Sequence, residues 1–256
     1  MRADAAKRLP RLGGMARANG VVIVSERYWA FAATDGSLHE GRTPPRPSFV
    51  QHVPLVRGLV RLGAAMSPLF RGRGVAGRRE RVLLAFAVVA PFLFFVLPAR
   101  LEFYAGMAVM LGLLVWLARG RTLNLHGAEH RAIAAVEERR LRATWEGDAH
   151  PSRFAARCGT NFAVLVVPIA ALGQAVWPLA VAAYTPVVLA LLSLAVTMEL
   201  WVAIESSGRR LLKTLLLPGL GLQRVTTREP ALGETQLALR ATASVLRREL
   251  SDDGVS

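Results

Sequence analysis

The stretch that decides the expected fold is Phe162–Glu205, FAVLVVPIAALGQAVWPLAVAAYTPVVLALLSLAVTMELWVAIE, whose charged residues are Glu199 and Glu205. A membrane core about 30 Å thick needs about 20 apolar residues in a helix, so this stretch is long enough for two membrane-spanning helices. Proline and aromatic residues near its middle favour a turn at the membrane interface. We predict helices near residues 162–180 and 183–204.

A second apolar region lies upstream, in Val82–Pro98 and Leu101–Ala118. Only Pro98-Ala99-Arg100 separates the two runs, which predicts a tight helical hairpin that either spans the membrane or re-enters it. A mean hydropathy of +0.35 with 53% hydrophobic residues is also too apolar for an ordinary soluble protein of this size. The predicted fold class is a mainly α integral membrane protein with about four transmembrane helices in two hairpins, together with cytoplasmic helices.

The N-terminal part of the chain predicts a small β-hairpin region. Residues 1–20 form a basic tail that prolines and glycines interrupt. Val21–Val24 is a β-branched run, and Tyr28–Thr34 is a second apolar run that the turn pair Asp35-Gly36 closes. We expect a hairpin or a short meander here, followed by a proline-rich connector at residues 41–47.

Apolar residues at helical spacing predict a helix within Val53–Phe70, with Arg57 and Arg61 on one flank. This helix would lie on the membrane interface as a basic amphipathic helix, or it would pack on the hairpin as a core helix; the pattern allows both. Arg71–Arg81 follows with five arginines and one acid, which predicts a juxtamembrane anchor on the cytoplasmic side.

The distribution of charge predicts the orientation. The net charge is +14, and Arg-rich segments occur at both ends of the chain and in residues 119–160. The positive-inside rule places them in the cytoplasm of a bacterial-type plasma membrane, with a multi-pass topology and both termini cytoplasmic. The lipid bilayer is therefore the expected partner; protein partners stay open, no specific nucleic-acid binding is expected, and nothing indicates the oligomeric state. The chain is therefore expected to consist of a cytoplasmic N-terminal region with the β-hairpin and the amphipathic helix (1–80), a first transmembrane hairpin (81–118), a cytoplasmic loop (119–160), a second transmembrane hairpin (161–206) and a cytoplasmic C-terminal region (207–256).

Metal-ligand chemistry is indicated by His126-Gly127-Ala128-Glu129-His130, which lies in the predicted cytoplasmic loop. On a helix the two histidines lie about 40° apart around the axis and about 6 Å apart along it, so both can reach one ion. With Glu129 as general base, this is the zinc-hydrolase motif in inverse order. The alternative is two half-buried histidines that only make hydrogen bonds near the membrane surface. Asn124 is the expected N-cap of this helix.

A third ligand would have to come from elsewhere in the chain. Cys158, the single cysteine, precedes the third predicted span and is a candidate ligand or nucleophile; a small buried residue at a tight turn is the alternative. Glu205 is expected at the same depth as the histidines, whereas Glu199 lies deeper and would pair with an Arg or a polar group. His150 is a further candidate, and Glu137 is expected to form a surface salt bridge.

Several blocks in one order resemble the YqhQ-like family of uncharacterised multi-spanning membrane proteins, over about residues 13–250. The blocks are Gly14–Gly20, Pro54–Gly58, His126–His130, Arg157–Phe162, Glu205 and Pro218–Pro230. The family is described as predicted metal-dependent enzymes, so the resemblance implies zinc or another divalent metal. Further candidate site residues within these blocks are Arg157, Thr160, Arg228 and Glu229.

The chain departs from this family in two places. Ala155 stands where the family usually has a histidine, two residues before the Arg-Cys-Gly-Thr block. If that histidine is a ligand in relatives, this chain must use His150, Cys158 or a carboxylate, or has lost the site. Ala18-Asn19-Gly20 also stands where an acid before the glycine is usual.

Two functions are consistent with the sequence. The first is a zinc hydrolase at the cytoplasmic membrane surface, with His126, His130 and either Glu205 or Cys158 as ligands and Glu129 as general base. The second is a non-catalytic membrane assembly or quality-control factor, whose basic face binds protein or lipid partners. A transporter is a weaker third option, because the predicted spans carry few polar groups and no evident inverted repeat.

Overall fold

The two apolar N-terminal runs pair as the central strands of an antiparallel sheet. The strands, in spatial order, are β1 (Gly13–Arg17), β2 (Gly20–Val24), β3 (Tyr28–Ala33) and β4 (Leu38–Arg42). The predicted hairpin is therefore a four-stranded meander among the described residues. β1 lies inside the predicted tail and β4 overlaps the predicted connector. Both were missed because pairing with the central strands, more than their own composition, makes them strands.

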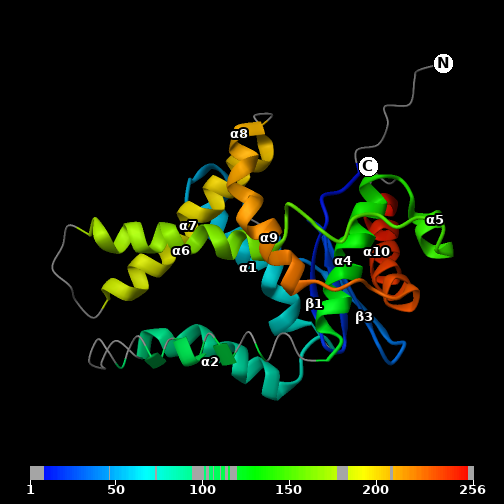
Figure 1. The fold of residues 1–256 in the computed structure, drawn as a ribbon, viewed down its shortest axis with the longest axis horizontal. Helices are drawn as coiled ribbons and strands as arrows, with labels where there is room; N and C mark the ends of the chain where they lie inside the picture. Colours follow the sequence, from blue (N-terminus) through cyan, green and yellow to red (C-terminus); the bar gives the residue numbers. More distant parts are fainter. Residues whose placement is uncertain are drawn as a thin grey trace.

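The computed structural model describes residues 9–45, 47–72, 74–93, 101, 104–105, 107–109, 111–112, 115, 120–177, 184–207 and 210–252. Figure 1 shows the sheet at one end of the molecule, with long helices projecting away from it. Most of the predicted span Leu101–Ala118, the linker Pro98-Ala99-Arg100 and the turn after Trp177 lie outside the described residues.

Both faces of the sheet are covered by other parts of the chain. Val21, Ile23 and Ala30 face α4 (Thr122–Glu137) and α10 (Leu232–Asp252), whereas Val22 and Phe31 face the end of α1 and the segment that follows it. This explains the nearly continuous apolar runs, since strands that are buried on both faces need no polar alternation. The core of the molecule lies in these two layers.

The predicted cytoplasmic helix is present, with corrected ends. It is α4, which begins at Thr122, and α5 (Leu141–Glu146) follows after a break at Arg139, whose φ is +56°. Asn124 is not its N-cap: it lies inside the helix and donates a hydrogen bond to the Glu229 carbonyl (3.0 Å). The cap prediction was wrong because this carbonyl, which comes from a distant segment, satisfies the amide instead.

The prediction of about four transmembrane helices is wrong for the part of the chain that the structure describes. By length and composition, one described helix could cross a membrane: α7 (Thr185–Ser206), over Thr185–Ile204. α6 (Gly159–Ala175) is apolar but covers about 26 Å, and α2 (Arg78–Leu93) begins with charged residues that shorten its apolar part. The orientation with both termini cytoplasmic stays a prediction.

The predicted helix after residue 53 is α1 (Val56–Arg71), preceded by the short η1 (Ser48–His52). Gly58 lies against Met198 of α7, where an added Cβ would come within 2.7 Å of the Met198 side chain, and Leu69 joins the core at the sheet. The position of this helix at the membrane interface stays a prediction. The side chain of Arg57 pairs with Glu199, with 2.8 Å between Nε and Oε1. The predicted pairing of Glu199 with an Arg is therefore confirmed.

The C-terminal part runs back from α7 to the sheet. α8 (Arg210–Lys213), η3 (Thr214–Leu216) and α9 (Leu217–Thr226) lead into an extended segment, and α10 then packs along α4 and the sheet. The Glu234 carboxylate accepts a hydrogen bond from the backbone N–H of Ala231 (2.9 Å), which caps the start of α10.

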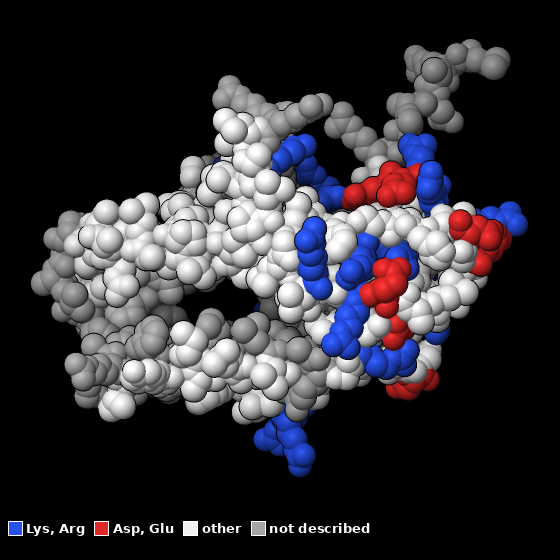
Figure 2. Space-filling view, in the orientation of Figure 1, with Lys and Arg blue, Asp and Glu red and all other residues white. Residues whose placement is uncertain are grey.

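Charged side chains are concentrated on one part of the molecule. Figure 2 shows Lys, Arg, Asp and Glu gathered over the sheet, α4 and α10, whereas the projecting parts of α6 and α7 present mainly uncharged residues. Large apolar side chains are exposed on these two helices, including Val167, Leu172, Leu191 and Val196. The polarity of the surface therefore changes along the long axis.

Candidate metal centre

Three metal-ligand side chains meet where α4 adjoins the start of α6. His126 and His130 lie one turn apart on α4, and Cys158 directly precedes α6. One donor atom from each lies within 4.8 Å of the others. The two imidazole rings meet edge to face, with 4.5 Å between centroids, and Cys158 Sγ lies 3.3 Å from His126 Nε2. This cluster could hold a metal ion, and it joins two histidines predicted from spacing to the predicted cysteine.

Backbone carbonyls orient both imidazole rings. His126 Nδ1 lies 2.8 Å from the Thr226 carbonyl oxygen, and His130 Nδ1 lies 2.7 Å from that of Arg153. A carbonyl oxygen can only accept, so each Nδ1 carries the proton and each Nε2 presents its lone pair to the cluster. Histidine ligands in metal sites are usually held in this way.

The cluster is buried, and one of its donors lacks a partner. His130 is 2% exposed and Cys158 is 5% exposed. Among the described residues, His130 Nε2 is a buried nitrogen with no hydrogen-bond partner. A buried polar atom without a partner is costly, and a bound cation would satisfy it. This observation, together with two nitrogen donors and one sulfur donor, fits a divalent metal such as zinc.

The cysteine is held by the first turn of α6. The backbone N–H of Thr160 donates to Cys158 Sγ (3.4 Å), and Thr160 Oγ1 lies 3.3 Å from the same sulfur. These contacts place the sulfur at a helix N-terminus, where partial positive charge favours an anion. Thr160, predicted as a candidate, therefore contacts the cysteine, and its hydroxyl also lies 3.5 Å from Thr226 Oγ1.

The segment 226–230 fits against the glycine of the histidine motif. A Cβ at Gly127 would lie 2.1 Å from the Arg228 carbonyl oxygen, so this close backbone approach requires glycine. The N–H of Arg228 also donates to the Leu123 carbonyl (2.9 Å). Arg228 therefore acts through its backbone here, and the segment delivers the Thr226 carbonyl to His126.

Glu129 occupies a different face of α4 from the clustered donor atoms. It is buried against β1, where a Cβ at Gly14 would lie 2.6 Å from its Cγ, and it accepts a hydrogen bond from the backbone of Ala16. Burial raises the pKa of Glu129 to about 7, against the opposing effects of His126 and the Ala16 hydrogen bond. Such a carboxyl exchanges a proton near neutral pH.

The other predicted residues whose side chains the structure describes are not part of the cluster. His150 is exposed and lies outside the grouped donors. Arg157 pairs with Glu137, as predicted for Glu137, and the Glu229 carboxylate pairs with Arg131. Glu205 lies in the last turn of α7, but its side chain lies outside the described part of the structure.

Two polar side chains that support the cluster were missed. Gln223 is fully buried and brackets Ala155: the Ala155 N–H donates to Gln223 Oε1 (2.9 Å), and Gln223 Nε2 donates to the Ala155 carbonyl (2.8 Å). Arg153 donates to the Thr227 carbonyl (2.7 Å), which fixes the loop whose carbonyl orients His130. Lone polar residues of this kind carry no spacing signal. Gln223 could have been suspected only from its place in the Pro218–Pro230 block.

Comparison with known proteins gives a family but no activity. A relative at 24% identity over 302 residues is "Uncharacterized protein YqhQ" of Bacillus subtilis (strain 168); the alignment covers 94% of this chain and 93% of the relative. No solved structure matches the chain. Residues 107–248 match the family described as "Protein of unknown function (DUF1385)". That match covers more than half of the chain, which therefore belongs to the DUF1385 family.

Proposed function

We propose that the protein is a membrane-associated, metal-dependent hydrolase whose metal site is the cluster of His126, His130 and Cys158. The single observation that carries the proposal is the convergence of three donors in a buried place, with one nitrogen left unpartnered. Three protein ligands leave a fourth position open, which is the pattern of catalytic zinc sites. A bound divalent cation would polarise a carbonyl or phosphoryl oxygen, or activate water, at that position.

The chain's own residues have distinct roles in this proposal. The Thr226 and Arg153 carbonyls hold the histidines in the tautomer that binds metal, and Thr160 holds the cysteine. Glu129 faces β1 and not the clustered donor atoms, so its role as general base requires a proton to pass to it through a water molecule, and its pKa near neutrality suits that exchange. His130 and Cys158 are buried, which strengthens the electrostatic interactions within the site, whereas His126 is half-buried.

The location at a membrane surface is supported by the arrangement of the helices. The cluster lies at the base of α6, where the charged body of the protein meets the apolar projecting helices (Figures 1 and 2). α7 is long and apolar enough to cross a membrane, and α6 packs against it. The cluster would therefore lie near the membrane surface in this proposal.

Metal content tests the proposal. Full-length protein purified in detergent after growth with zinc should contain about one metal per chain, measured by inductively coupled plasma mass spectrometry. His126→Ala, His130→Ala and Cys158→Ser should each lose the metal. His150→Ala is the matched control, because this histidine is exposed and lies outside the cluster; it should keep the metal. Metal-free wild-type protein, or metal retained in all three variants, would refute the site.

Hydrolysis is tested separately with p-nitrophenyl acetate and p-nitrophenyl phosphate. Glu129→Gln should keep the metal and lose most of the zinc-dependent rate, since the amide cannot accept the proton. Equal zinc-dependent rates in the wild type and Glu129→Gln would show that Glu129 is not the general base.

A structural metal in a non-catalytic assembly factor is the second candidate. The favouring observation is that the cluster links three elements, because the His126 side chain on α4 contacts both the Thr226 carbonyl at the end of α9 and the Cys158 sulfur at the start of α6. In that case metal removal would lower the unfolding temperature while crosslinks to partner proteins would persist in Glu129→Gln. The hydrolase proposal instead expects the variant to fold normally and to lose turnover.

A further inference from the structure

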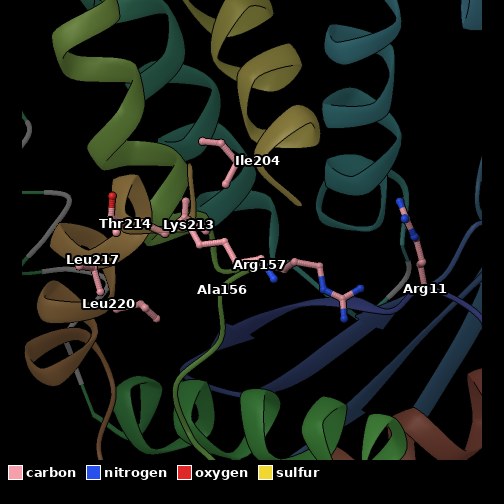
Figure 3. A pocket seen from close by; sticks show the side chains of 9 residues that line it. Arg11, Ala156, Arg157, Ile204, Lys213, Thr214, Leu217 and Leu220 are labelled. Carbon is pink, nitrogen blue, oxygen red and sulfur yellow. The ribbon is translucent and has the colours of Figure 1, made fainter. Parts of the chain in front are cut away.

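A cavity of about 530 Å³ lies beside the loop that carries Cys158. Its lining includes Ala156 and Arg157, the two residues that precede this cysteine, and Ile204 at the end of the candidate membrane span. Figure 3 shows Arg11 on one side of the cavity and Leu217 and Leu220 on the other. The cavity is therefore built by three parts of the chain that are distant in sequence.

The lining combines positive charge with apolar surface. Arg11, Arg157 and Lys213 contribute to it, and the described lining residues include no carboxylate, although Arg157 also pairs with Glu137 at its edge. Thr214 adds a hydroxyl, and leucines form much of the remaining wall. Three cationic side chains and a hydroxyl thus line an apolar cavity at different points (Figure 3), a combination that suits a phosphate group attached to a hydrocarbon body.

The position of the cavity favours a lipid over a soluble phosphate compound. It lies at the end of α7, where a membrane-crossing helix would leave the hydrocarbon core. Leu211, Leu215 and Leu217 are exposed beside it, and Leu211 is 80% exposed. Acyl chains could cover these side chains while the headgroup occupies the cavity. Basic residues at the end of a membrane helix commonly bind anionic headgroups.

We infer that this cavity binds the phosphate headgroup of an anionic phospholipid. The inference deepens the proposed function, because it places an anionic lipid beside the metal cluster as the class of substrate. Binding itself needs no metal, so it is measured in Cys158→Ser protein, which the proposed function expects to lack the metal. A failure of the hydrolase proposal would then leave this measurement unaffected.

The experiment titrates the full chain in detergent with dihexanoyl phosphatidylglycerol, dihexanoyl phosphatidylcholine or inorganic phosphate, and counts bound ligand by native mass spectrometry. We expect tight binding of phosphatidylglycerol and at least about tenfold weaker binding of the other two. Arg11→Gln combined with Lys213→Gln should weaken phosphatidylglycerol binding by about tenfold or more, because two charge-assisted contacts are lost. Both side chains are exposed, so the fold should be retained.

Arg247→Gln is the matched control, since Arg247 is exposed on α10, outside the cavity lining. It should bind phosphatidylglycerol like the wild type. Equal binding of the two lipids, or unchanged binding in the double variant, would overturn the inference. Inorganic phosphate that binds as tightly as phosphatidylglycerol would show that the cavity takes a free anion and would likewise overturn it.

Discussion

We call the sheet with α4 and α10 the body, and the projecting helices α6 and α7 the arm. Both parts are rich in apolar residues, but they differ in how far they bury them. In the body, Val21, Ile23 and Phe31 are fully buried between layers of protein. In the arm, Val167 is 67% exposed and Leu172 is 63% exposed. The body completes its own core, whereas the arm leaves apolar surface that water would solvate poorly.

The comparison teaches that an apolar run alone does not say what covers it. Short apolar runs, β-branched in β2 and aromatic with alanine in β3, formed strands covered by helices, while longer runs formed helices that the protein covers only in part. The metal cluster takes two donors from the body and one from the base of the arm. Changes in the body should therefore affect stability, and changes in the arm should affect membrane association.

The largest effect is expected in the arm. Val196→Asp places a charge near the middle of the candidate span, at a side chain that is 40% exposed. This should cost about 3–4 kcal/mol of membrane insertion, because Asp is unfavourable and Val favourable at a helix centre. Membrane fractions extracted with alkaline carbonate should release the variant and retain the wild type. Ala243→Asp, at an exposed position on α10 of the body, should stay membrane-bound. Release of the wild type by alkaline carbonate would show that α7 of the arm does not cross the membrane.

The next effect concerns the buried acid of the body in metal-free protein. The pKa of Glu129 is about 7 in the folded state and near 4.5 when exposed, so its stabilising protonated form is lost as pH rises. Relative to Glu129→Gln, the wild type should lose about 3 kcal/mol of unfolding free energy between about pH 4.5 and pH 8. Urea unfolding at both pH values measures this difference. A difference that does not change with pH would show that Glu129 is not held in a desolvated place.

A smaller loss is expected from the glycine of the histidine motif. Gly127→Ala would force a Cβ against the Arg228 carbonyl and should destabilise the body by about 2 kcal/mol. Gly233→Ala is the control, because nothing lies within 4 Å of the added Cβ, and it should be neutral or slightly stabilising. Thermal unfolding of both variants tests this contrast. Equal unfolding temperatures for the two variants would show that the Arg228 carbonyl does not lie close to Gly127.

The smallest effect should arise at the junction of body and arm. Gln223→Ala removes both hydrogen bonds to Ala155 and loosens the loop before Cys158. Supporting residues of this kind typically change metal affinity by about tenfold, which is about 1.4 kcal/mol. Competition with a chromogenic zinc chelator measures the affinity. Gln236→Ala, which removes a hydrogen bond to the Trp145 carbonyl, should leave it unchanged. Equal affinities for both variants would show that Gln223 does not position the cysteine.

The local parts of the fold could be predicted from the sequence, because periodicity and turn residues act over a few positions. The two central strands and the turn at Asp35-Gly36 were predicted within a few residues. β1 was missed because its glycines suggested a tail, whereas Gly14 is needed where Glu129 packs. Within the described ranges, the number of spans was overestimated because hydropathy does not reveal where helices end.

The candidate site was likewise predictable only where its residues carry a local pattern. The spacing of His126 and His130 predicted two side chains that meet, and the Arg-Cys-Gly-Thr block supplied Cys158. The carbonyls of Thr226 and Arg153 could not be predicted, since every residue has a carbonyl and these contacts join distant segments. For the same reason, the bracket that Gln223 forms around Ala155 has no local signature.

The central claim is that the junction of body and arm holds a metal through two imidazoles and one thiolate. X-ray absorption of the zinc-loaded full-length protein tests it most directly. We predict one sulfur at about 2.3 Å and two histidine nitrogens at about 2.0–2.1 Å from zinc in the wild type. A zinc shell of oxygen and nitrogen without sulfur in the wild type would contradict the account.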